Sequence, residues 1–128
     1  LMAELRKAGF EIAYPTRRAS HEFIVTMKDI KDKTGVTAMN LAKRLLDKGY
    51  HAPTTYFPML VPECLLIEPA ETESKETLDA FVKSMKEILQ EIELQPDMIK
   101  GAPHTMPVRK LDDVKAAREL DLAWKPSV

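Results

Sequence analysis

The strongest constraint on the fold is a long amphipathic helix predicted between residues 74 and 96. Its apolar side chains recur every three or four residues, so they form one continuous stripe along the helix. Such a stripe must be covered by a second apolar surface, which requires a layered domain. We expect Ser74 to begin the helix, Pro96 to end it, and Asp79, Lys83 and Glu87 to form a solvated opposite face. The stripe consists of Leu78, Phe81, Val82, Met85, Ile88, Leu89 and Ile92.

Shorter elements predict the surface that covers this helix. A second amphipathic helix follows Thr37, a suitable N-cap, and stops at Gly49. A first helix, residues 1–8, stops at Gly9, and nothing precedes Leu1 to cap it, which is typical of a piece cut from a longer chain. The other predicted elements are strands at 10–14, 21–28, 54–57 and 64–67, a charged loop at 29–33, an extended stretch at 101–110 and a short helix at 112–119.

This element order predicts an α+β fold: a two-layer sandwich of a small, mostly antiparallel sheet with helices on one face. We place residues 1–128 in a single domain. The same order matches the first five elements of a ferredoxin-like fold, in which residues 101–110 would supply a further strand. The alternative function is therefore a free-standing regulatory module that binds a small molecule such as an amino acid.

Charge and composition exclude several classes of partner. The formal net charge is −1 and the charges are interspersed, so we expect no nucleic-acid partner. There is no apolar run of the roughly 20 residues that span a bilayer, and no secretory leader, so we expect no membrane partner and a cytoplasmic location. The single cysteine, Cys64, is interpreted as a small buried apolar group. The three histidines lack metal-ligand spacing, so no metal site is expected.

Three polar clusters occur where the predicted elements end. They are His21-Glu22, His51-Ala52-Pro53-Thr54 and Glu68-Pro69-Ala70-Glu71. Each has an ordinary structural explanation: His21 would pack at a strand end beside Phe23, Pro53 would form a turn, and carboxylates commonly precede a helix. Loops carry most functional residues, so the middle cluster is the preferred candidate.

At these clusters the sequence resembles the C-terminal end of the glycine cleavage system P-protein, a glycine decarboxylase. Tyr56-Phe57-Pro58 and residues 71–79 are similar to subunit 2 of the two-chain form. Ala70 stands where the family usually has threonine, and the tail at 119–128 diverges. The resemblance is carried by His21-Glu22-Phe23-Ile24, Ala42-Lys43-Arg44-Leu45, His51-Ala52-Pro53-Thr54, Cys64-Leu65-Leu66-Ile67-Glu68-Pro69 and Ala102-Pro103-His104-Thr105.

The resemblance implies the small C-terminal domain of a fold-type I pyridoxal phosphate enzyme. The intact enzyme would decarboxylate glycine together with subunit 1 and transfer the aminomethyl group to the lipoyl arm of the H-protein. The lysine that binds the cofactor would lie in a large domain outside this chain, so we expect this chain alone to be inactive and to bind no pyridoxal phosphate.

Small domains of such enzymes border the cofactor cleft. On that ground His51 and Thr54 are the first candidates for residues beside the substrate, with Glu71 and His104 as further candidates. We also expect an apolar patch at Met2, Leu5 and Trp124, where the large domain would dock, and this patch favours self-association of the isolated chain.

Overall fold

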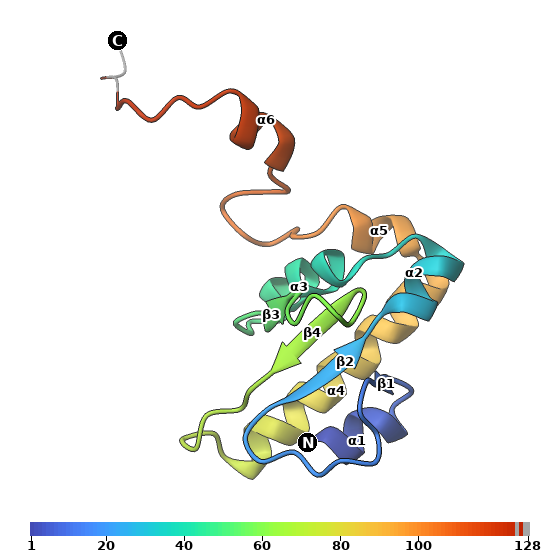
Figure 1. The fold of residues 1–128 in the computed structure, drawn as a ribbon. Helices are drawn as coiled ribbons and strands as arrows, with labels where there is room; N and C mark the ends of the chain where they lie inside the picture. Colours follow the sequence, from blue (N-terminus) through green and yellow to red (C-terminus); the bar gives the residue numbers. More distant parts are fainter. Residues whose placement is uncertain (125, 127–128) are drawn as a thin grey trace.

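A four-stranded antiparallel sheet and the helices packed on it form the body of the protein in a computed structural model, which describes residues 1–124 and 126. The strand order is β1-β2-β4-β3 (Figure 1). This arrangement confirms the predicted α+β two-layer sandwich. In chain order the elements are α1 (Met2–Lys7), β1 (Glu11–Ile12), β2 (Phe23–Thr26), α2 (Lys28–Thr34), α3 (Ala38–Asp47), β3 (Thr54–Thr55), β4 (Cys64–Ile67), α4 (Lys75–Leu94), α5 (Pro96–Lys100) and α6 (Asp113–Arg118).

The core lies between one face of the sheet and the helices α1, α3 and α4. Strands β2 and β4 pair so that Phe23 lies opposite Ile67 and Val25 lies opposite Leu65, and all four side chains are buried. Side chains alternate between the two faces of a strand, so these four point to the same side. The predicted stripe of α4 supplies the other half of the core through Phe81, Met85, Ile88 and Ile92, which are buried.

Both predicted helix starts are confirmed by hydrogen bonds. The Thr37 hydroxyl accepts from the Asn40 amide at 3.2 Å, and the Asn40 side chain accepts from the Thr37 amide at 3.0 Å, which closes a capping box. The Ser74 hydroxyl accepts from the Thr77 amide at 3.2 Å at the start of α4. At the other end of α3, Gly49 has a φ of 83°, a conformation that glycine adopts without strain.

The prediction of a charged loop at residues 29–33 was wrong, because Lys28–Thr34 forms the helix α2. This helix has no fully buried residue, so it carries no apolar periodicity that the sequence could reveal. It is held instead by an ion pair between Lys28 and Asp32, 2.5 Å apart, and by Gly35, which ends it in the left-handed conformation.

The ferredoxin-like alternative is not favoured. Within the described part of the chain, residues 101–110 form turns and bends and pair with no strand. The predicted short helix after residue 111 is present as α6, and Figure 1 shows that it projects away from the body.

Two predictions about individual side chains were wrong. Leu5 is fully buried in the core rather than exposed in a docking patch, since α1 packs directly on α4. Met2 is partly buried against the same core, whereas Trp124 is 86% exposed. His21 precedes β2 and is exposed, with its Nδ1 atom 2.9 Å from the Ser20 hydroxyl, so it is not buried at the strand end.

The prediction for Cys64 is confirmed. The side chain is buried, and burial raises the pKa of its thiol, which therefore stays protonated at neutral pH.

The burial of Leu5 predicts a large effect of its truncation. Leu5→Ala should lower the free energy of unfolding by about 2–5 kcal/mol, because it leaves a cavity between α1 and α4. The matched control is Leu120→Ala, since the Leu120 side chain is 68% exposed and its truncation should have almost no effect. Urea unfolding of both variants measures the difference, and equal midpoints would contradict the packing of α1 described above.

Candidate functional site

An open cleft of about 380 Å³ lies between the start of α4 and the segments that flank β3 and β4. Its floor is apolar: Tyr50 and Phe81 meet edge to face with ring centroids 5.2 Å apart, and Leu66 and Leu78 lie beside them. Five polar side chains surround this floor. They are His51, Thr54, Glu68, Glu73 and Thr77.

Two short segments bring these polar residues together. Thr54 pairs with Leu66 in the sheet, so the segment containing His51 and Thr54 is held against the end of β4. Directly after β4 the chain turns through Glu68 and Pro69 toward α4, where Thr77 lies in the first turn. Residues from two segments, 51–54 and 68–77, therefore line one cleft.

The cleft combines two carboxylates, two hydroxyls and one imidazole over an apolar floor. Carboxylates accept hydrogen bonds from an ammonium group, while hydroxyls and an imidazole N–H donate to a carboxylate. This arrangement suits a small ligand that carries both charges. No lysine or arginine is among the described residues that line the cleft, so no side chain of either type is available there to form an imine or to bind a phosphate group.

The four candidate residues do not all meet. His51 and Thr54 lie together in the cleft. Glu71 is exposed on the loop at its rim, between the lining residues Ala70 and Glu73, but does not itself line it. His104 lies outside the cleft, on the turn that follows α5.

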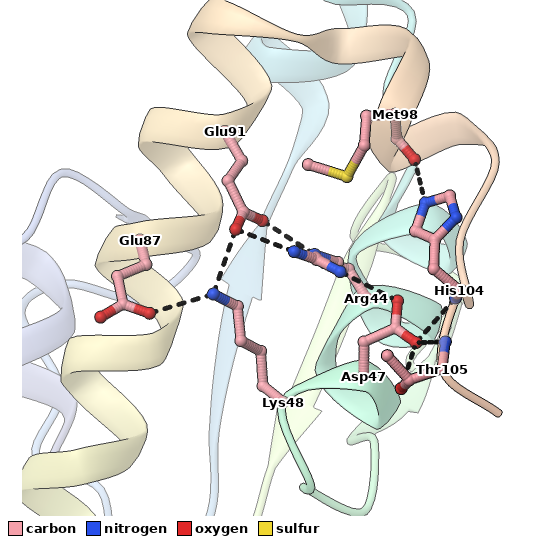
Figure 2. Close-up of polar contacts among 8 residues, drawn as sticks. All are labelled: Arg44, Asp47, Lys48, Glu87, Glu91, Met98, His104 and Thr105. Atoms are coloured by element: carbon pink, nitrogen blue, oxygen red, sulfur yellow. Dashed lines mark hydrogen bonds and ion pairs between the residues drawn. The ribbon is translucent and has the colours of Figure 1, made fainter.

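His104 belongs to a polar network at the C-terminal end of α3 (Figure 2). Its ring Nε2–H donates to the Met98 carbonyl at 2.8 Å. The Oδ1 atom of Asp47 accepts from the backbone N–H groups of His104 and Thr105, at 2.7 and 2.8 Å, and from the Thr105 hydroxyl at 2.9 Å. These bonds hold the turn against the C-terminal end of α3. The contacts of His104 therefore stabilise the fold.

The same network joins α3 to α4 through opposite charges. Arg44 binds Glu91 through two parallel hydrogen bonds of 2.8 and 2.9 Å and also contacts Asp47 at 3.1 Å. Lys48 lies 3.0 Å from both Glu87 and Glu91 (Figure 2). Two-point pairing of a guanidinium with a carboxylate is among the stronger ionic contacts in proteins. Glu87 is therefore part of an interhelical ion pair, which corrects its assignment to a solvated ladder.

The surroundings of these groups shift their pKa values. Burial alone would raise the pKa of Asp47, whose side chain is 1% exposed, but the hydrogen bonds from Thr105, His104 and Arg44 outweigh burial and lower it to about 2. The hydrogen bond from Arg44 lowers the pKa of Glu91, and the same bond raises that of Arg44. All three groups therefore stay charged at neutral pH.

Sequence reasoning missed this network, although a signal for it exists. Arg44 in α3 and Lys48 at its C-cap are four residues apart, and Glu87 and Glu91 are four residues apart on α4. Residues at this spacing share a helix face, so two such pairs of opposite charge beside two apolar stripes indicate that the helices are neighbours.

Comparison with known proteins identifies the family. The model of the family described as "Glycine dehydrogenase, C-terminal domain" matches residues 1–105. The chain belongs to the glycine dehydrogenase C-terminal domain family. The match covers every element of the body and ends at Thr105, where the Asp47 hydrogen bonds hold the chain.

Relatives in this family include two proteins named "Probable glycine dehydrogenase (decarboxylating) subunit 2". The one from Nitrosospira multiformis is 87% identical over 125 residues, which are 98% of this chain and 25% of the relative. The one from Nitrosomonas europaea is 84% identical over 127 residues, 99% of this chain and 26% of the relative. The chain thus spans about a quarter of the length of these glycine dehydrogenase subunits.

Two further observations concern the described residues of this glycine dehydrogenase domain. None of their helices is both long and apolar enough to cross a membrane. They also contain no group of three or more histidine, cysteine or acidic side chains arranged to hold a metal ion.

The lowered pKa of Asp47 predicts how the stability of the domain depends on pH. Because the folded pKa is about 2, below the usual value near 4, the charged carboxylate stabilises the fold fully above about pH 4. The contribution, roughly 2 kcal/mol, is lost as the pH falls toward 2. Asp47→Asn should therefore lower the free energy of unfolding by roughly that amount at pH 7, and the gap to the wild type should close toward pH 2.

The control for this experiment is Asp97→Asn. Its side chain is 94% exposed and pairs with Lys100 at 3.2 Å, so its replacement should leave the pH profile almost unchanged. The profiles come from urea unfolding between pH 2 and 7. An Asp47→Asn profile parallel to that of the wild type would show that Asp47 is not the titrating group.

Proposed function

We propose that this domain forms one wall of the active site of a glycine decarboxylase, the P-protein of the glycine cleavage system. In this proposal residues 1–128 are the C-terminal domain of subunit 2, which acts with subunit 1. The whole enzyme removes carbon dioxide from glycine and transfers the aminomethyl group to the lipoyl arm of the H-protein. The proposal rests on the family match over residues 1–105, together with the polar cleft at His51 and Thr54.

The cleft residues would bind and orient the substrate. Glycine carries an ammonium and a carboxylate group, and the cleft offers acceptors at Glu68 and Glu73 and donors at His51, Thr54 and Thr77. The apolar floor of Tyr50 and Phe81 excludes water from one side. The cleft is open on the other side, so the rest of the longer polypeptide would complete it, as sites at domain interfaces commonly require.

The cofactor of the family, pyridoxal phosphate, acts as a sink for the electrons released in decarboxylation. The residues that line this cleft do not fit it, because none of them is a lysine that could form an imine with it or an arginine or lysine that could bind its phosphate. The cofactor would therefore be held by the rest of the polypeptide, and the contribution of this chain is restricted to the substrate side. Glu71 lies at the rim, beside the lining residue Ala70, and is a further candidate for contact with the substrate.

Replacing His51 tests this role in the full-length subunit 2, assembled with subunit 1 and supplied with lipoylated H-protein. His51→Ala should lower glycine turnover by on the order of 10²- to 10⁴-fold if the imidazole transfers a proton or positions the substrate. Thr54→Ala, on the same wall of the cleft, should also lower glycine turnover. Neither change should lower the melting temperature much, because both side chains are exposed.

His104→Ala is the matched control. It removes the hydrogen bond to the Met98 carbonyl and should lower the free energy of unfolding by about 1 kcal/mol. Turnover below the melting temperature should be nearly normal, because His104 lies outside the cleft. If His51→Ala instead gave normal turnover and a lowered melting temperature, the segment 51–54 would be a turn with no role in the reaction.

The chain by itself should form no stoichiometric, borohydride-stable adduct of pyridoxal phosphate on any single lysine, because the cleft contains no lysine. Mass spectrometry of the reduced mixture measures this directly. A stoichiometric adduct on one lysine of this chain would contradict the assignment of the cofactor to the rest of the enzyme.

A further inference from the structure

The loop between β3 and β4 exposes a cluster of large apolar side chains. Met59 and Leu60 are each 90% exposed, and Phe57 and Tyr56 are 59% and 43% exposed. We call these four residues the apolar loop. They are adjacent in the sequence and lie on one hairpin, so their exposed surface is concentrated in one place, unlike apolar residues scattered singly over a surface.

The segment 56–63, which contains the apolar loop, is anchored to the body of the domain at both ends. At its ends, the Tyr56 amide donates to the Cys64 carbonyl at 3.0 Å, and the Met27 amide donates to the Glu63 carbonyl at 2.8 Å. The Thr26 hydroxyl donates to the Pro62 carbonyl at 2.8 Å. The loop is thus bonded to β2 as well as to its own hairpin.

The side chain of Glu63 adds a second anchor, because it accepts from Lys31 at 2.7 Å and from the Ala38 amide at 2.9 Å. Tyr56 and Glu63 have positive φ angles of 60° and 49°, a left-handed conformation that is strained for residues other than glycine. Strained backbone persists where the surroundings hold it, and it concentrates at functional and binding sites.

An apolar cluster on a segment that is anchored at both ends is well suited to docking. Groups that are already ordered lose little conformational freedom on binding, and large apolar anchors contribute most of the affinity of an interface. The apolar loop contributes no side chain to the core between the sheet and the helices, so the stability of this core does not explain its exposed residues.

The loop is continuous with other incompletely covered apolar surface. Ile24 and Leu66 are paired across β2 and β4 on the face opposite the core, and both are only half buried. Figure 1 shows β2 and β4 in front of α4. Leu66 also lines the cleft, and Thr54 of the cleft is two residues from Tyr56. The cleft, this second sheet face and the apolar loop therefore adjoin one another.

We propose that the apolar loop seats in an apolar pocket on the remaining part of the same polypeptide. This inference rests on the proposed function, in which the domain belongs to a longer subunit. About three quarters of the relatives' length lies outside the matched region. A covalently joined segment has an effective concentration in the millimolar range, which favours it over a separate subunit or a second copy for the same surface.

Oxidation of Met59 in the full-length subunit 2 tests the proposal. Dilute hydrogen peroxide converts exposed methionines to sulfoxides, and peptide mass spectrometry follows each methionine separately. Met59 should be oxidised at least about tenfold more slowly in the folded subunit than in the urea-unfolded subunit, because burial shields the thioether. Met85, which is fully buried within this domain, is the internal reference for slow oxidation.

Three other outcomes overturn the proposal. Protection that increases with protein concentration would identify a second copy as the partner. Protection that appears only after subunit 1 is added would identify that subunit. Oxidation at the unfolded rate under all conditions would mean that nothing covers the loop. None of these readings depends on turnover, so the inference can fail while the proposed function stands.

A pair of matched variants separates docking from general stability. Leu60→Asp in the full-length subunit should return Met59 to nearly the unfolded oxidation rate, while Met85 stays protected because the body remains folded. Leu122→Asp is the control, since its side chain is 87% exposed on the tail beyond α6 and its replacement should leave Met59 protected. Equal Met59 protection in both variants would show that Leu60 does not anchor the loop.

Discussion

Burial of the apolar stripe of α4 against the paired strands β2 and β4 is the interaction on which the rest of the structure depends. Met85 and Ile88 are fully buried there, and so are Val25 and Leu65 on the facing strands. Each such side chain contributes on the order of 1.5–3 kcal/mol relative to the exposed state. Once this layer forms, α1 and α3 bury their own apolar faces against it. This packing fixes where the two helices lie on the sheet and on α4.

The polar network between α3 and α4 depends on that packing. Arg44 and Glu91 meet because the apolar stripes beside them are already in contact, and their two-point pairing then fixes how the helices lie along each other. Asp47 extends the network to the turn at His104 and Thr105, so the direction in which the chain leaves the body is set by a carboxylate at the end of α3. The match to the family ends at this same turn.

The surfaces left open by this packing are the ones to which we assign a function. The cleft at His51 and Thr54 has an apolar floor, a polar rim and an open side, and the apolar loop beside it is exposed. A domain that spans a quarter of its relatives' length is expected to present such surfaces to the rest of the polypeptide. Substrate binding and docking would then occur on adjoining parts of one face.

Much of the fold follows from the sequence alone, because its signals are local. The stripe of α4, the caps at Thr37 and Ser74 and the strand Cys64–Ile67 depend on residues within a few positions of one another, and the structure confirms all of them. Helical periodicity and capping act over one or two turns, so neighbouring residues contain the necessary information. The segments containing His51 and His104 could also be selected as candidate sites, because the sequence resembles the family there.

Tertiary structure decided which of those segments share a site. Hydrogen bonds that span 57 positions place His104 beside Asp47 rather than in the cleft, and a contact that spans 47 positions pairs Arg44 with Glu91. The burial of Leu5 was likewise settled by a distant partner, since α1 packs on α4. Such pairings depend on how the packed layers place distant segments, which no short stretch of sequence specifies.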